Sequence, residues 1–141
     1  MKAYFGRRYT FSASHRLHSS ALSDGENRAA YGKCNNPHGH GHNYIVEVLV
    51  GGPIDPETGM VVNLTHLDDV VHTHVLQRFD HANLNLDPLF TSLVPTTENL
   101  CILTFELLEK QLTPGTLEYV RVEETENNFF QQFAEHASSL H

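Results

Sequence analysis

The stretch KCNNPHGHGHNY, residues 33–44, contains Cys34 followed by histidines at every second position, His38, His40 and His42. In an extended segment alternate side chains share a face, so His40 and His42 are expected to point the same way. Two imidazoles at this spacing can bind one metal ion. Zinc, however, takes at least three protein ligands and, where it is catalytic, keeps a further position open. A third ligand must therefore come from another part of the chain.

His15 is the best candidate for that third ligand. It ends an alternating stretch in which Phe11 and Ala13 share its parity, a pattern typical of a half-buried strand. If this strand pairs antiparallel with the one that contains His42, the end of the first lies beside the start of the second. We therefore predict that His15 meets His40 and His42. Three neutral imidazoles favour zinc over magnesium or calcium, although they also suit iron and copper.

Cys34 lies six residues before His40, in a loop that contains Pro37 and Gly39. Three roles are open to it: a further ligand in a structural site of cysteine and histidine, a reactive thiol, or a buried bystander. A metal ion or Lys33 nearby would lower the pKa of its thiol and favour the thiolate. The simpler alternative for the whole stretch is an exposed histidine run that binds metal adventitiously.

Two further groups of polar residues stand at the ends of predicted helices. Asp80 and His81 follow the first helix, where a carboxylate can orient or charge an imidazole for acid–base work. A surface acid beside a capping histidine is the plain structural explanation. Thr96, Thr97 and Glu98 begin the second helix, where N-terminal capping explains all three without a function.

Glu124 shares the parity of Val120 and Val122, on the strand face that we expect to be buried. A carboxylate on such a face costs free energy unless hydrogen-bond donors meet it. Cys101, in contrast, lies among the apolar residues of the second predicted helix and is interpreted as part of the core.

These residues must be positioned by a small set of elements. The patterns predict strands at residues 3–15, 42–52 and 60–64, and two more strands within 116–133 around a turn at 126–128. They also predict two helices. The first covers residues 65–79 and is capped by Thr65, and the second begins at Thr96 or Thr97 and ends before Pro114. Residues 17–33 are predicted to form a long loop. The expected fold is α+β, a largely antiparallel sheet with two helices on one face.

Length and composition narrow the class of protein. The 141 residues suit one domain, and a chain of that length can bury a hydrophobic core without the help of disulfide bonds or structural metal ions. Two cysteines suggest no disulfide framework, and we see neither a signal peptide nor a membrane span, so a cytoplasmic protein is expected. The net charge of −8 argues against nucleic acid as a main partner. The tail, about residues 134–141, is expected to be partly disordered.

Several ordered motifs carry a family resemblance. FSASHRL, CNNPHGHGHNY, DPETGMVVNL, DHANLN, TTEN and VEETENN, between residues 11 and 128, resemble the 6-pyruvoyltetrahydropterin synthase family, whose relatives include 6-carboxytetrahydropterin synthases. The resemblance implies the tunnelling fold, a four-stranded antiparallel sheet with two helices on one side. It also implies that three such sheets close into a β-barrel and that two trimers form a homohexamer, which removes exposed sheet edges.

The resemblance implies a role for each candidate residue. The zinc ligands are His15, His40 and His42; the catalytic base is Cys34; Asp80 and His81 work with that cysteine across a subunit boundary; Glu124 anchors the pterin; and Thr96, Thr97 and Glu98 line its pocket. The implied reaction is the zinc-dependent conversion of 7,8-dihydroneopterin triphosphate to 6-pyruvoyl-5,6,7,8-tetrahydropterin with release of triphosphate. Arg16, Arg28 and Lys33 are cations near the site in sequence, and the resemblance assigns none of them to the triphosphate.

The spacing within the histidine run bears on the branch of the family. Five residues separate Cys34 from His40, as in pyruvoyl synthases, whereas three separate it from His38, the spacing typical of the carboxy branch. We choose His40 and His42 because HGHNY runs into a strand. The alternatives are 6-carboxytetrahydropterin synthase, an aldolase-like cleavage, a zinc hydrolase of phosphoesters, and a non-catalytic zinc module in which Cys34 is the fourth ligand.

Overall fold

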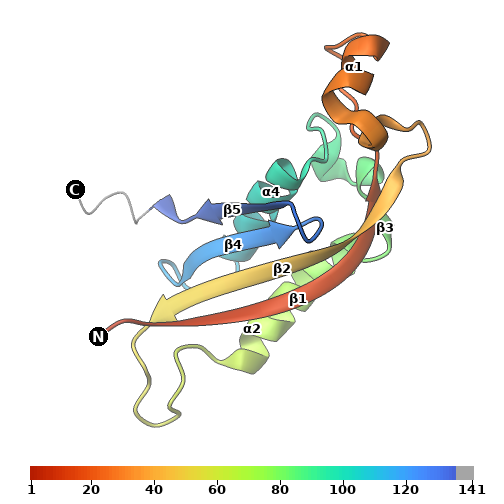
Figure 1. Ribbon diagram of the computed structural model, residues 1–141. Helices are drawn as coiled ribbons and strands as arrows, with labels where there is room; N and C mark the ends of the chain where they lie inside the picture. Colours follow the sequence, from red (N-terminus) through yellow and green to blue (C-terminus); the bar gives the residue numbers. More distant parts are fainter. Residues whose placement is uncertain (136–141) are drawn as a thin grey trace.

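A computed structural model describes residues 1–135 and shows one curved, mixed sheet with helices packed on one face (Figure 1). The strand order is β3-β1-β2-β4-β5. The strands are β1 (Ala3–His15), β2 (His40–Gly52), β3 (Ala82–Asn83), β4 (Leu117–Glu123) and β5 (Phe129–Phe133). All neighbouring pairs are antiparallel except β3, which runs parallel to β1.

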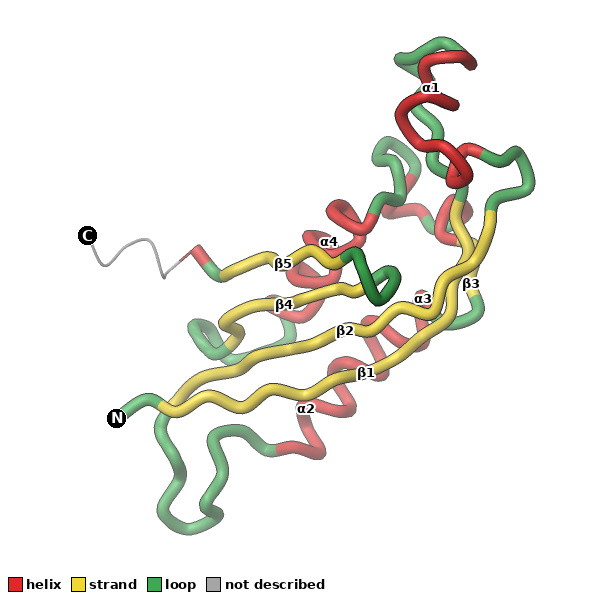
Figure 2. Tube along the Cα trace, viewed as in Figure 1, coloured by secondary structure: helices red, strands yellow, loops and turns green. Residues whose placement is uncertain are grey.

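Two helical segments cover one face of this sheet. The first is continuous from α2 (Leu64–Val71) through a π-helical turn, η2 (His72–Leu76), into α3 (Gln77–Phe79), and the second is α4 (Thr97–Glu109). A further helix, α1 (Asp24–Tyr31), is followed by the 3-10 turn η1 (Gly32–Asn35). It stands beyond the edge of the sheet where β1 ends and β2 begins (Figure 2). Two more 3-10 turns, η3 (Leu84–Leu86) and η4 (Pro88–Phe90), connect β3 toward α4.

Strict alternation along the strands builds the core. Every second residue of β2 from Tyr44 to Val50 is fully buried, while the residues between them are partly exposed on the other face. The buried row packs against apolar residues of both helical segments, including Leu67, Val71, Leu100 and Leu108. The helix-covered face of the sheet is therefore the one on which His15, His40 and His42 also stand.

The register between β1 and β2 brings the histidines together. His15 pairs with His40, and Ala13 pairs with His42, at the last and third-last residues of β1. Gly39 makes this approach possible: its φ is +68°, and a Cβ there would lie 2.7 Å from the carbonyl oxygen of His15. Only glycine fits such a left-handed position against another backbone.

Several sequence-based expectations about the elements were wrong. The long loop predicted for residues 17–33 contains α1, which begins with a capping box in which Ser23 and Glu26 each satisfy the backbone N–H of the other. Residues 60–64 form no strand, because Asn63 instead caps α2, whose cap we had assigned to Thr65. The sheet has five strands rather than four, because the short parallel β3 adds to the outer edge of β1.

The expected α+β class, with helical segments on one face of the sheet, is confirmed, whereas the trimeric barrel stays a prediction. The architecture is α+β, and the second helix is capped by Thr96, whose side chain accepts a hydrogen bond from the Asn99 N–H. Of the tail expected to be partly disordered, Ala134 is buried and bonded through its N–H to the Glu118 carbonyl, whereas residues 136–141 lie outside the described part. Within residues 1–135, every helix is too short or too polar to cross a membrane.

Candidate active site

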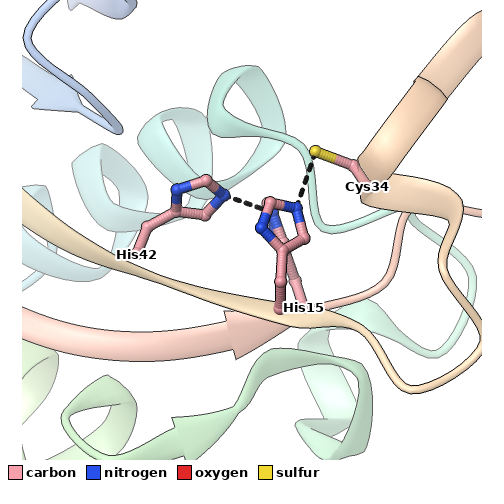
Figure 3. A group of neighbouring side chains, drawn as sticks. His15, Cys34 and His42 are labelled. Carbon is pink, nitrogen blue, oxygen red and sulfur yellow. Dashed lines mark hydrogen bonds between the residues drawn. The ribbon is translucent and has the colours of Figure 1, made fainter.

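Four potential metal ligands converge at the end of β1. The ligand atoms of His15, Cys34, His40 and His42 all lie within 4.8 Å of one another. His42 Nε2 is 3.1 Å from His15 Nε2, and His40 Nε2 is 3.0 Å from Cys34 Sγ. Figure 3 shows the side chains of His15, His42 and Cys34 pointing toward one another, from β1, β2 and the turn after α1. Four donors from three segments make a cluster that could hold a metal ion.

The ring of His15 is oriented by a hydrogen bond on its far side. Its Nδ1 lies 2.8 Å from the carbonyl oxygen of Pro95, and a carbonyl can only accept, so Nδ1 carries the proton and donates. The lone pair of Nε2 therefore faces His42. Two imidazole nitrogens 3.1 Å apart need a proton or a cation between them, and Nε2 of His15 cannot supply the proton. This outer hydrogen bond is of the kind that fixes metal-binding histidines.

Burial keeps the imidazoles of His15 and His42 in the uncharged form that binds metal. Burial lowers the pKa of His15, which is only 1% exposed, and the neighbouring His42 and His40 add to that effect against the opposing hydrogen bond to Pro95. Burial also lowers the pKa of His42. At neutral pH both rings are therefore uncharged, and a neutral imidazole is the species that coordinates a metal.

The pKa of the Cys34 thiol shifts in the opposite direction. Burial, and then the negative charge of Glu124, raise the pKa of its thiol. The lowering that we expected from Lys33 is therefore absent when the protein groups act alone. A cation bound among the three imidazoles would offset both the burial and the carboxylate, since thiolates form next to metals.

A cleft of about 600 Å³ adjoins the cluster and collects the residues expected to bind the pterin. It is lined by Leu17, Ala30, Tyr31, Thr96, Thr97, Glu98, Glu124, Asn127, Asn128, Phe129 and Phe130. The Thr97 hydroxyl donates a hydrogen bond of 2.7 Å to Glu124, whose side chain is 12% exposed. The carboxylate oxygens of Glu124 lie 3.8 Å from His42 Nε2 and 3.9 Å from His15 Nε2, so the cleft and the cluster share a wall.

Asp80 and His81 lie apart from Cys34 within one chain. Asp80 accepts a hydrogen bond from the Ser12 N–H and lies 3.1 Å from His81 Nδ1. The Ser12 hydrogen bond, more than His81, holds the pKa of Asp80 below its usual value. His81 has a φ of +60°, and its side chain is 84% exposed at the outer edge of β1. Among residues 1–135, neither residue contacts Cys34 by a hydrogen bond or an ion pair.

His38, the alternative partner in the histidine run, stays outside the cluster. Its side chain is exposed, and its backbone N–H donates to the Asn36 side chain. Seven cleft residues were missed from the sequence: Leu17 after β1, Ala30 and Tyr31 of α1, Asn127 and Asn128 of the turn before β5, and Phe129 and Phe130 of β5. The S-x-x-E pattern from Ser23 to Glu26 was the signal that could have revealed α1.

Known proteins are similar to this chain in sequence and in fold. Residues 4–135 match the family described as 6-pyruvoyl tetrahydropterin synthase. The chain is 52% identical to the 6-pyruvoyl tetrahydrobiopterin synthase of Homo sapiens over 128 residues, 90% of this chain and 88% of that protein. It is 50% identical to the Drosophila melanogaster protein of the same name, over 89% of this chain and 76% of that protein.

A solved structure agrees with these sequence matches. That of Caenorhabditis elegans 6-pyruvoyl tetrahydropterin synthase is similar with a TM-score of 0.91 and 42% sequence identity, covering 96% of this chain and 97% of that one. The sequence matches and the structural similarity agree with the ligand cluster found at the end of β1. The chain belongs to the 6-pyruvoyl tetrahydropterin synthase family.

Proposed function

We propose that this chain catalyses the conversion of 7,8-dihydroneopterin triphosphate to 6-pyruvoyl-5,6,7,8-tetrahydropterin with release of triphosphate. The observation that carries the proposal is a cluster of three imidazoles and a thiol that shares a wall with a carboxylate-lined cleft. Relatives about half identical over most of the chain bear the name of this activity. Both cysteines are free thiols, which suits a reducing compartment, and we assign the enzyme to the cytoplasm, which cell fractionation can verify.

Zinc is the metal that we assign to His15, His40 and His42. The donor set fits, because all three rings offer nitrogen and because His15 is fixed in the tautomer that leaves Nε2 free. When bound, zinc supplies Lewis acidity toward the hydroxyl groups of the substrate side chain and so acidifies the neighbouring C–H bonds.

Glu124 is suited to hold the pterin ring. Its carboxylate can accept hydrogen bonds from the amino-pyrimidine edge, and such charge-assisted bonds are strong where water is excluded. The Thr97 hydroxyl already donates to one of its oxygens and so fixes the orientation of the carboxylate. Because Glu124 is 3.8 Å from His42, a ring held by it places the pterin side chain at the cluster.

Cys34 is the residue that we assign to proton abstraction. As a thiolate it takes the proton from C1′ of the substrate side chain, and the ring is reduced as the side chain is oxidised, so no nicotinamide is needed. A second abstraction at C2′ expels triphosphate. The thiol is partly buried and belongs to the cluster, so it lies within reach of a substrate that enters the site.

The open edges of the sheet support a shared site. From Ala3 to Ser12 the outer edge of β1 pairs with no strand of the described chain, and β5 forms the opposite edge with Phe129 and Phe133 more than half exposed. Long free edges are a liability unless another chain covers them. We therefore assign a trimer that closes the sheet into a barrel, stacked into a hexamer. Asp80 and His81, on the β1 edge, would then face Cys34 of a neighbour.

A non-catalytic zinc module is the second candidate. Cys34 Sγ lies 3.0 Å from His40 Nε2 and belongs to the same cluster, so it could close the site as a fourth ligand. Such a closed site would leave no position for a substrate.

The first prediction concerns the reaction. Zinc-loaded protein incubated with 7,8-dihydroneopterin triphosphate should yield 6-pyruvoyltetrahydropterin and one inorganic triphosphate per turnover, both measured by mass spectrometry. A carboxylated or aldolase-type pterin product would reassign the branch within the family. Inorganic phosphate in place of triphosphate would instead identify a phosphoester hydrolase.

The second prediction concerns the metal. Elemental analysis should find one zinc per chain, and X-ray absorption should give Zn–N distances of about 2.0–2.1 Å. His42→Ala should lose most of the zinc, because two imidazoles hold it poorly. His38→Asn is the matched control from the same histidine run and should keep the wild-type content. Loss of zinc from the His38 variant would show that the ligand register is wrong.

The third prediction separates base from ligand at Cys34. Cys34→Ala should retain zinc and melting temperature yet lose roughly two to four orders of magnitude in turnover, the usual contribution of a general base. Cys34→Ser should do little better, because a hydroxyl is far harder to ionise. If zinc and stability fall together in the alanine variant, Cys34 is a structural ligand and the catalytic assignment fails.

The fourth prediction tests the shared site. Cys34→Ala and Asp80→Ala hexamers should each be nearly inactive. After the two are unfolded and refolded together, random mixing should restore activity at about a quarter of the interfaces, where both wild-type halves meet. Refolding each variant alone is the control. No recovery in a mixture that light scattering shows to be hexameric would place both residues in one subunit's site or remove Asp80 from it.

A further inference from the structure

A second cavity lies next to the cluster and shares no lining residue with the pterin cleft. It has a volume of about 530 Å³. It is lined by Arg16, Asp24, Arg28, Gly32, Lys33, Asn35, Asn36, Pro37 and His40. We call it the basic cavity, because three cationic side chains and one carboxylate line it. His40 belongs both to this lining and to the metal cluster, so the two spaces are neighbours.

The cations of the basic cavity differ from most others in the chain. Of nine lysines and arginines, five form ion pairs with carboxylates: Lys2, Arg7, Arg8, Arg78 and Arg121. Within residues 1–135 the other four make no ion pair, and three of these four line this one cavity. Only Lys110, after α4, lies elsewhere. Unpaired cations gathered in a chain of net charge −8 indicate an anion site.

Ordered backbone presents these cations. Arg16 Nε donates to the Asn35 carbonyl, and the Arg16 backbone is held on both sides by the Asn85 amide. Arg28 belongs to α1, whose start is fixed by the Ser23 capping box and whose end is closed by the Gly32 N–H bonded to the Arg28 carbonyl. Lys33 lies in η1, directly before Cys34. Two guanidinium groups and an ammonium group thus reach one space from three fixed points.

The position of the cavity matches the shape of the substrate. The pterin ring, the side-chain hydroxyls and the triphosphate follow one another in a line. The cleft meets the cluster at Glu124, which lies close to His15 and His42, whereas the basic cavity meets it at His40. A substrate with its ring in the cleft and its hydroxyls at the cluster would therefore direct its phosphates into the basic cavity.

We propose that the basic cavity binds the triphosphate group of the substrate through Arg16, Arg28 and Lys33. Guanidinium groups bind phosphate oxygens in pairs, and the lysine adds a point charge. The cavity thereby selects the triphosphate over dephosphorylated dihydroneopterin. This proposal rests on the proposed function for the identity of the ligand, whereas the site itself is defined by its three unpaired cations.

The test compares Arg28→Gln and Lys33→Gln with Lys110→Gln, the matched control that removes an unpaired cation elsewhere. Arg16 is left unchanged, because its Nε also supports η1. Calorimetry on the zinc-loaded proteins measures binding of inorganic triphosphate. Arg28→Gln and Lys33→Gln should each weaken that binding roughly tenfold, the loss of one charge-assisted hydrogen bond. The KM for the substrate should rise by a similar factor with a smaller change in kcat, and Lys110→Gln should match wild type in both.

The outcomes separate this proposal from the proposed function. Wild-type affinity for inorganic triphosphate in both cavity variants, with zinc content and melting temperature retained, would overturn the basic cavity as the anion site. A wild-type protein that binds triphosphate through Arg28 and Lys33 but does not turn over the substrate would overturn the proposed reaction and leave the anion site standing. If one variant fails to fold, the other decides the question.

Discussion

The antiparallel register of β1 against β2 is the constraint on which the site depends. It sets His15 opposite His40 and Ala13 opposite His42, so that three imidazoles stand on the helix-covered face. A slip of one residue would turn the histidines of one strand to the other face and dissolve the cluster. Gly39 helps to hold the register, because the chain can enter β2 against the His15 carbonyl only where no side chain intervenes.

Burial then shifts the pKa values of His15 and His42 on these strands and of Cys34 beside them. The same loss of water lowers the pKa of His15 and raises that of Cys34, since it penalises an imidazolium and a thiolate alike. Glu124 adds a negative charge close to the imidazoles. At neutral pH the site therefore holds the uncharged rings of His15 and His42 and a protonated thiol beside the Glu124 carboxylate, and a divalent cation would be stabilised there. Metal binding and ionisation of the thiol are therefore expected to be coupled.

Helix α1 joins the parts of the site that lie around the cluster. Ala30 and Tyr31 line the pterin cleft, while Arg28 lines the basic cavity, so one short helix contributes to both. The position of α1 relative to the preceding segment is fixed by the fully buried side chain of Asn27. Its Nδ2 donates hydrogen bonds to the backbone carbonyls of Ser19, Leu22 and Ser23. Polar contacts of this kind order a segment that offers little apolar surface to bury. They explain how the helix can stand beyond the end of the sheet (Figure 1).

The sequence by itself determined those features that follow from local periodicity. Alternation predicted the long strands that became β1 and β2, the shared face of His40 and His42, and the partial burial of Glu124, while Thr96 marked the start of α4. Only the tertiary structure decided the rest. Residues 60–64 have the pattern of a strand but find no neighbouring strand to pair with. The start of α1 is marked in the sequence by Ser23 and Glu26, but its position is held by the buried Asn27 rather than by an apolar stripe. The meeting of Arg16, Arg28 and Lys33 in one cavity arises where the chain after β1, helix α1 and turn η1 come together. A hydrophobic period depends only on residues that are neighbours in the sequence. The pairing of strands and the convergence of side chains depend on contacts between separate segments of the chain.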